Sequence, residues 1–330
     1  MRLIRWLSII LLSVTTGVFV LAQASTPEAT ETPEMAEEEI LPIELEAVDP
    51  FDYNGTIVIA GSSTVDPLTQ RLLEAFIDDG FLDDVVNDGG GTGAGFERFC
   101  ISGETDIANA SRAIKQKEID ACLANGRTPI EFRVGTDALA VVVSQENTFI
   151  DSLTIEELNL AFGTARTWAE VREGFPDEPI LLYAPGVDSG TFDYFVEAVF
   201  GNDETALLAA SGLQLSEDDN VLVRGVVSSP YAIGFFGFAY YVENTDTLRA
   251  VAVEGVEPTE ETAENGDYPL ARPLFIYSDA NTMQAKPQVA AFINYYLTNV
   301  NRYILEVGYF PASVQALNTA KENWLLGMGK

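Results

Sequence analysis

Short runs of aliphatic and β-branched residues alternate with segments of helical hydrophobic spacing from Phe51 to the C-terminus. Segment 56–60 predicts a strand, and the apolar residues within 68–77 predict a helix soon after it. This repeated succession of strand and helix is typical of an α/β fold. Further strands are predicted over 106–110, 132–134, 139–143, 180–183, 221–227, 234–241, 248–253 and 274–277, further helices over 155–162, 192–199, 287–299 and 313–325, and a Glu-rich loop over 258–267.

Three turns rich in glycine and hydroxyl side chains lie directly before predicted helices. They are Gly61–Thr64, Gly91–Gly95 and Asp188–Thr191. The start of a helix offers unpaired N–H groups and the positive end of the macrodipole, and glycine lets an anion approach the backbone closely. Ordinary N-capping is the commoner explanation of any one of these turns. Three of them, at the C-terminal ends of predicted strands, favour a site for a small tetrahedral oxyanion.

Arg112 is the cationic side chain that the pattern places beside these turns. It follows Ser111 at the end of the predicted strand 106–110. A single arginine is more often a solvated surface residue. Because only 16 basic residues stand from Phe51 onward, Arg112 is a candidate for a bidentate clamp on an anion.

The acidic balance of the chain excludes one class of partner. The formal charge is −33 for the whole chain, and 16 basic against 42 acidic side chains leave −26 from Phe51 onward. Binding to a phosphate backbone requires a basic face, so nucleic acid is excluded as a partner. The same charge opposes long-range steering of an anion. Any anion site must therefore act through short-range hydrogen bonds.

The N-terminus has the pattern of a secretory signal over residues 1–24. Arg2 and Arg5 precede the apolar run 6–21, and Ala22–Ala24 has the small-x-small cleavage pattern. An uncleaved membrane anchor is the alternative, although the short run and the cleavage pattern favour removal. Residues 25–50, rich in Pro, Thr and Glu, predict an acidic flexible spacer. We therefore expect an exported protein, in the periplasm or on the outer cell surface.

Cysteine and histidine usage bear on compartment and chemistry. Cys100 and Cys122 fit a disulfide in an exported protein, with two buried free thiols as the alternative. Histidine is absent, which excludes a Ser-His-Asp triad and the usual zinc ligand. The glycines of 89–95 lack the dinucleotide-binding spacing, and 186–190 has Asp where a nucleophile elbow needs Ser. We expect no enzymatic activity, no cofactor and no metal.

Four segments together resemble the phosphate-binding proteins of ABC-type phosphate importers, the PstS family. They are GSSTVDPL at 61–68, GGGTGAGFERFC at 89–100, ETDIANASRAIK at 104–115 and YAPGVDSGTFDYF at 183–195, with further likeness at 134–143 and 221–241. The resemblance covers nearly everything from about Thr56 to the C-terminus. It implies a two-lobed periplasmic-binding-protein fold with a hinge and a ligand cleft between the lobes. Lobe I would take 51–135 plus 246–330, and lobe II 136–245.

The resemblance also implies which residues bind phosphate. Lobe I would contribute Ser63, Thr64 and Thr92, with Arg112 matching an arginine of one branch of the family. The turn in the other lobe would contribute Ser189, Gly190 and Thr191.

The chain departs from other branches of the family at two positions. They carry an aspartate where Arg112 stands, and an arginine where this chain has Pro185. A carboxylate that accepts the proton of hydrogenphosphate rejects fully ionised sulfate, so the missing aspartate affects selectivity. Asp137 is the candidate replacement, and a capping residue of the hinge loop is the alternative interpretation.

The sequence thus predicts an exported, monomeric solute-binding protein that captures inorganic phosphate and delivers it to the membrane permease of an ABC importer. Three alternatives stay open. The same fold could bind sulfate, molybdate or arsenate. The chain could be a phosphatase-like exported enzyme, or a surface sensor or adhesion protein with a vestigial anion site.

Overall fold

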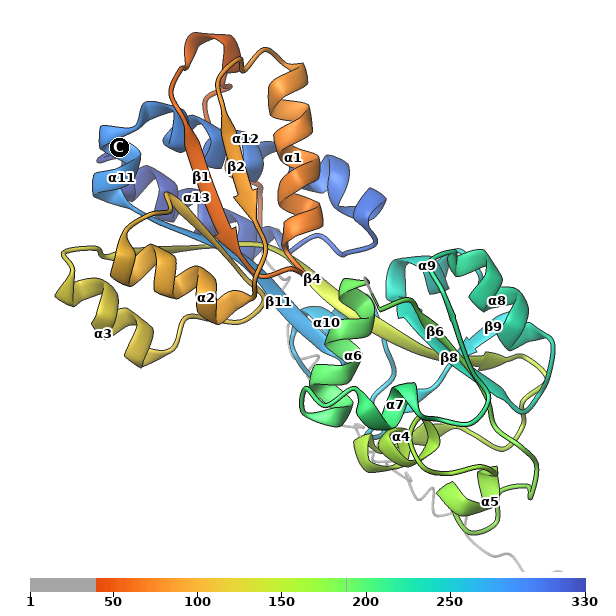
Figure 1. Cartoon of the computed structure of the whole chain (residues 1–330). Helices are drawn as coiled ribbons and strands as arrows, with labels where there is room; N and C mark the ends of the chain where they lie inside the picture. The colour runs from red at the N-terminus through yellow and green to blue at the C-terminus, as the bar shows by residue number, and fades with distance from the viewer. Residues whose placement is uncertain (1–39, 188) are drawn as a thin grey trace, which may run out of the picture. The chain divides into compact units, whose positions relative to one another are not determined.

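The computed structural model describes residues 40–187 and 189–330, and the ribbon views confirm an α/β architecture (Figure 1). The predicted signal peptide and the spacer up to residue 39 lie outside the described residues. The strands are β1 Ile57–Gly61, β2 Val85–Asp88, β3 Ile107–Ala110, β4 Pro129–Ser144, β5 Ser152–Leu153, β6 Leu181–Pro185, β7 Leu213–Ser216, β8 Ala232–Gly237, β9 Leu248–Ala250, β10 Ala252–Val253 and β11 Ala271–Asp279.

The helices lie mainly between successive strands. They are α1 Asp66–Asp78, α2 Thr92–Glu97, α3 Gln116–Ala124, α4 Ile155–Ala161, α5 Trp168–Val171, α6 Gly190–Phe200, α7 Thr205–Leu208, α8 Asp219–Val227, α9 Phe238–Val242, α10 Glu260–Glu264, α11 Ala280–Ala285, α12 Pro287–Tyr303 and α13 Val314–Gly327. Short 3-10 helices span Pro50–Asp52 and Ile304–Val307, and a π-helical turn spans Arg98–Ser102. No helix in the described part of the chain has the length and apolar character needed to cross a bilayer.

One mixed sheet carries most of the strands, in the order β2-β1-β3-β11-β4-β8-β6-β7, with β9 paired to β4. β1 runs parallel to β2 and β3, and β6 runs parallel to β7 and β8. The long antiparallel strands β4 and β11 join these two parallel groups and lie side by side (Figure 1). The two groups are therefore connected through continuous strands, and the chain passes between them in β4 and again in β11.

The buried side chains form separate clusters on the two parts of the sheet. The first core includes residues of 45–134 and 274–324, and the second core includes residues of 139–270. Residues 248–270, which the sequence analysis assigned to lobe I, contribute Val251, Val253 and Leu270 to the second core. They pack there because β9 pairs with β4 and β10 pairs with β5. The chain returns to the first core within β11, later than the expected boundary at residue 246.

Several predicted elements differ from the structure. Segment 221–227, predicted as a strand from its valines, lies in α8, where the Asp218 carboxylate accepts a hydrogen bond from the Asn220 N–H at 2.9 Å. Leu222 and Val226, one helical turn apart, are both buried, so a valine-rich run here forms a helix face. Segment 234–241 divides into β8 and α9, and the Glu-rich loop 258–267 contains α10, which Thr259 caps.

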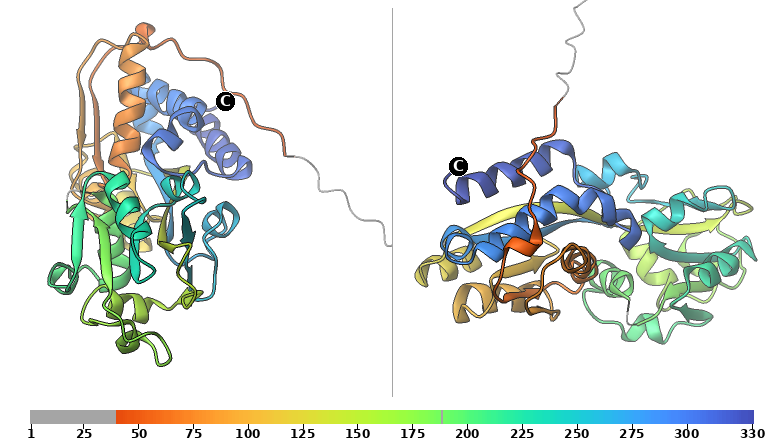
Figure 2. Two further views of the ribbon diagram at one scale, coloured as in Figure 1. Left: turned by 90° about the vertical axis from the view of Figure 1, so that its right-hand side faces the viewer. Right: turned by 90° about the horizontal axis from the view of Figure 1, so that it is seen from above.

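The end of the predicted spacer is ordered on the first core. The Ile43 N–H donates to Asn318 Oδ1 at 2.7 Å, Lys321 Nζ donates to the Ile43 carbonyl at 2.7 Å, and Leu45 is buried. Residues 40–50 therefore lie against α12 and α13 (Figure 2), and the prediction of a flexible spacer is wrong for this stretch. Local composition predicted a spacer because these hydrogen-bond partners lie about 250 to 280 residues away in the sequence.

The first two hydroxyl-glycine turns contact each other at Gly95. A Cβ atom added to Gly95 in α2 would lie 2.5 Å from the Gly61 Cα and 3.0 Å from the Ala60 carbonyl oxygen. The Gly91 N–H also donates to the Gly61 carbonyl at 2.9 Å. Only a residue without a side chain allows α2 to pack this closely on the end of β1.

We predict that Gly95→Ala lowers the free energy of unfolding by about 1–3 kcal/mol, because the added methyl group must displace backbone. Gly93→Ala is the matched control in the same helix, since a Cβ there meets no atom within 4 Å. The control should be neutral or stabilise by about 0.4–1 kcal/mol. Urea denaturation measures both, and equal effects would contradict the close-packing argument.

Candidate anion site

A cavity of about 550 Å³ lies at the carboxyl ends of β1 and β3. Open parallel sheets bind ligands at this edge. The first two predicted turns line the cavity, and Arg112 and Arg272 line it too. The lining comprises Ser62, Ser63, Thr64, Gly91, Thr92, Gly93, Ser111, Arg112, Asp193, Val196, Glu197, Asn202, Asp203, Glu204 and Arg272. The structure thus brings four predicted binding residues (Ser63, Thr64, Thr92 and Arg112) to one cavity.

Thr92 and Ser111 join the second turn to the end of β3. The Thr92 hydroxyl oxygen accepts a hydrogen bond from the Ser111 N–H at 3.2 Å and lies 3.2 Å from the Ser111 hydroxyl. This pairing fixes Ser111, and with it the backbone that leads to Arg112. A hydroxyl pair can redirect its protons without moving heavy atoms, so both oxygens remain available to donate to an anion.

Arg112 reaches the cavity from the segment after β3 and is held by Glu118 of α3. Its two terminal nitrogens donate to the two Glu118 carboxylate oxygens at 2.9 and 2.8 Å. Hydrogen bonds from Arg112 and from the Lys115 N–H outweigh partial burial and lower the pKa of Glu118. The predicted disulfide is confirmed: Cys100 bonds Cys122 of α3. The bridge ties α3, and hence Glu118, to the turn that follows α2.

Arg272 at the start of β11 is a further candidate binding residue at the cavity, which the sequence pattern did not predict. Its Nη2 donates to Thr64 Oγ1 at 2.6 Å and its Nε donates to Asp137 Oδ2 at 3.1 Å. Its Nη1 donates to Glu197 Oε2 at 3.2 Å, and its guanidinium lies over the ring of Tyr194 at 3.7 Å. One side chain therefore contacts the first turn, β4 and α6. A charged residue just before an apolar strand was the available signal, but nothing local indicated its partners.

Asp137 is buried in β4 and does not line the cavity, whereas its partner Arg272 does. Burial raises the pKa of Asp137, and the Arg272 charge opposes that rise. Its Oδ1 atom is buried without a hydrogen-bond partner in the described residues. A buried acceptor without a donor is costly in a folded protein, so this oxygen stands out as available for a further proton donor.

Two carboxylates of α6, Asp193 and Glu197, also line the cavity. Partial burial raises the pKa of Asp193. The positive charge of Arg272 opposes this rise, the negative charge of Glu197 adds to it, and the pKa is raised overall. Together with Asp137, they place three acidic side chains around Arg272.

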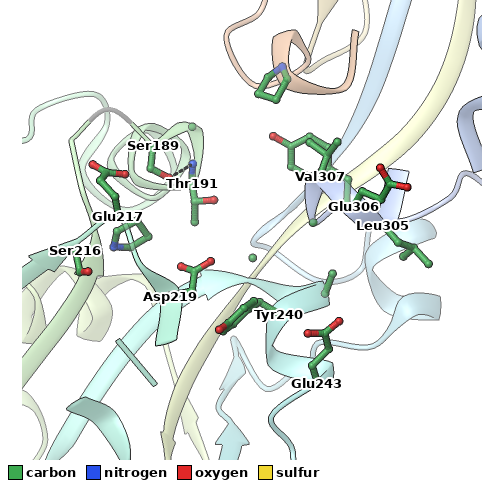
Figure 3. Close-up of a pocket in the computed structure, with 17 residues that line it drawn as sticks. Ser189, Thr191, Ser216, Glu217, Asp219, Tyr240, Glu243, Leu305, Glu306 and Val307 are labelled. Atoms are coloured by element: carbon green, nitrogen blue, oxygen red, sulfur yellow. Dashed lines mark hydrogen bonds between the residues drawn. The ribbon is translucent and has the colours of Figure 1, made fainter. Parts of the chain in front are cut away.

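The third predicted turn lines a neighbouring cavity of about 490 Å³ instead. Ser189 and Thr191 stand at the start of α6, where the Thr191 N–H donates to the Ser189 hydroxyl at 3.2 Å (Figure 3). Acidic side chains surround the same space: Glu217, Asp219, Glu243 and Glu306 (Figure 3). The structure therefore does not bring all three turns into one cavity.

Gly190 is the point at which the third turn approaches the first. A Cβ added to Gly190 would lie 3.8 Å from the Thr64 Cα and 4.0 Å from the Ser63 carbonyl oxygen. The start of α6 is thus in near contact with the turn after β1.

The described residues contain no group of three or more Asp, Glu, Cys or His side chains arranged to hold a metal ion. The polar groups that the cavity offers to an anion include hydroxyl side chains and the guanidinium groups of Arg112 and Arg272. This set can bind and release an oxyanion by hydrogen bonding.

Known proteins are similar to this chain in fold and in sequence. A family model described as a PBP superfamily domain matches residues 24–300. The chain belongs to this superfamily. SphX of Synechocystis sp. is 41% identical over 292 residues, which cover 86% of each chain. The phosphate-binding protein PstS of Staphylococcus saprophyticus is 34% identical over 255 residues, covering 76% of this chain and 78% of its own length.

Solved structures agree with these relatives. A possible phosphate-binding protein from Planctomyces limnophilus has a TM-score of 0.79 and 39% identity, covering 84% of this chain and 99% of that one. An ABC-type phosphate transport receptor from Vibrio cholerae has a TM-score of 0.61 and 25% identity, covering 78% of this chain and 99% of that one. The resemblance found in the sequence and the predicted binding-protein fold are confirmed.

We predict that Arg272→Met lowers the free energy of unfolding by about 3–5 kcal/mol, because it leaves the buried Asp137 carboxylate unpaired. The double variant Asp137→Asn/Arg272→Met should recover part of the loss, since it also removes the buried charge. Arg71→Met is the control: its pair with Glu306 is largely exposed and its loss should cost less than about 1 kcal/mol. Urea denaturation compares the three, and a double variant no more stable than Arg272→Met would contradict the assignment.

Proposed function

We propose that this protein is an exported solute-binding protein that captures inorganic phosphate and delivers it to the membrane permease of an ABC importer. The observation that carries the proposal is the cavity at the ends of β1 and β3, where two hydroxyl turns meet Arg112 and Arg272. Its relatives named PstS and the phosphate receptors among the solved structures support the same ligand. Binding and release require no covalent bond to be made or broken.

The proposed ligand contacts follow from the donors at the cavity. Hydroxyls of Ser63, Thr64 and Thr92 replace water around the anion, and Arg112 offsets its charge. Ser189, Gly190 and Thr191 would complete the shell from the start of α6 when the two parts of the protein close around the ligand. A charge-assisted hydrogen bond contributes about 1.5–3 kcal/mol net, so a few of them suffice for sub-micromolar binding.

We propose β4 and β11 as the hinge strands, because the chain passes between the two cores in them. Lobe I is then 40–135 plus the chain from within β11 to the C-terminus, and lobe II is the intervening part. A signal peptide over 1–24 and an acidic spacer before residue 40 would place a monomeric protein in the periplasm or on the outer cell surface.

We predict that the protein binds phosphate and that Arg112→Ala weakens binding about 10- to 100-fold, because a charge-assisted contact is lost. Ser189→Ala should weaken it by a smaller factor. Isothermal titration with phosphate measures the dissociation constants, and thermal unfolding checks that both variants fold. Unchanged affinity in both variants would refute the site assignment. A wild-type protein that ignores phosphate but binds sulfate, molybdate or arsenate would refute the ligand.

Discrimination between phosphate and sulfate requires an acceptor for the proton of hydrogenphosphate, since both anions are dianions near neutral pH. We propose Asp137, because its Oδ1 is a buried acceptor beside Arg272 without a partner in the described residues. Asp137 does not line the cavity, so this role requires that closure of the protein around the anion bring the two into contact. We predict that Asp137→Asn reduces the sulfate-to-phosphate ratio of dissociation constants at least tenfold. Competition titrations test this. An unchanged ratio would mean that Asp137 holds Arg272 in place but does not accept the proton of hydrogenphosphate.

A further inference from the structure

Glu197 contacts the same guanidinium that an anion in the first cavity would use. Its Oε2 accepts a hydrogen bond from Arg272 Nη1 at 3.2 Å, and both residues line the cavity. The Arg272 side chain is 9% exposed, whereas the Glu197 side chain is 56% exposed. The cation is therefore fixed in the protein, and the carboxylate that reaches it from α6 is free to swing into solvent.

The other two hydrogen-bond acceptors of Arg272 are held in place by the fold. The Asp137 carboxylate, in β4, accepts a hydrogen bond from Arg272 Nε. The Thr64 hydroxyl, in the first turn, accepts one from Arg272 Nη2. Both of these partners are buried. Glu197 is thus the displaceable partner among the three, and Nη1 is the donor that an incoming anion can gain.

The carboxylate of Glu197 has the charge and the acceptor geometry of one edge of an oxyanion. An anion beside Nη1 and the Glu197 carboxylate on Nη1 disfavour each other, because two negative charges would lie against the same nitrogen and repel each other. Because the Glu197 carboxylate is half-exposed, water can replace Arg272 around it, so the exchange is easy. The contact also links α6, whose apolar face lies in the second core, to Arg272 beside the first turn.

We infer that Glu197 is an internal competitor for phosphate: it occupies Arg272 in the anion-free protein and is displaced on binding, which lowers the affinity. This inference rests on the proposed function and deepens it. It makes Glu197 an affinity-determining residue rather than a ligand. Its removal should therefore strengthen the binding of every oxyanion that uses Arg272, by the same factor for each.

The test compares Glu197→Gln, Glu197→Asp and Glu204→Gln with the wild type by titration with phosphate and with sulfate. Glu197→Gln should tighten phosphate binding about fivefold and leave the sulfate-to-phosphate ratio unchanged. Glu197→Asp keeps the charge but is one methylene too short for the 3.2 Å contact, so it should also tighten binding. Glu204 lies at the same cavity and has no side-chain hydrogen bond to Arg272, so Glu204→Gln should change affinity less than twofold.

Other outcomes overturn the inference in distinct ways. Weaker phosphate binding by Glu197→Gln, with a reduced preference over sulfate, would make Glu197 a ligand that accepts the phosphate proton. Equal tightening by Glu197→Gln and Glu204→Gln, with none by Glu197→Asp, would show a general charge effect. A wild type that binds neither anion refutes the proposed function and this inference together. Wild-type binding with unaltered affinity in all three variants refutes the inference alone.

Discussion

The guanidinium of Arg272 is the group on which the anion site depends. It is buried among the turn after β1, the strand β4 and the helix α6, and it bonds a residue of each. A buried cation needs a buried counter-charge, which Asp137 supplies. With Asp137 holding one side of the group, the remaining N–H donors have fixed positions. The cavity therefore presents oriented donors before any ligand arrives.

The excess of acidic residues sets the second constraint. Carboxylates line both cavities, and the whole chain carries a formal charge of −33. Attraction over distance cannot collect an anion in such a field, and exposed charges are screened beyond about 10 Å. Affinity must come from hydrogen bonds at contact distance, formed by hydroxyls, backbone N–H groups and a few arginines. A receptor of this kind gains selectivity from the geometry of its donors and acceptors.

The parts of the site that could be read from the sequence are those in which adjacent residues carry the signal. Ser63, Thr64 and Thr92 stand in turns that the local pattern of glycine and hydroxyl residues predicted, and the resemblance to the PstS family assigned them to phosphate. Arg112 was predicted because it follows the end of another strand. The structure places these four at one cavity. The neighbouring cavity of Ser189 and Thr191 was not predicted, because the place of α6 depends on how the second core packs.

The sequence by itself predicted the alternation of strands and helices, a disulfide between Cys100 and Cys122, the first two turns and the resemblance to phosphate-binding proteins. Each follows from local pattern or from short motifs. Only the tertiary structure decided that the valine run of 221–227 is a helix, that residues 40–50 pack on α12 and α13, and that Arg272 joins Thr64, Asp137 and Glu197. These features depend on contacts between residues far apart in the chain, for which a local pattern carries no signal.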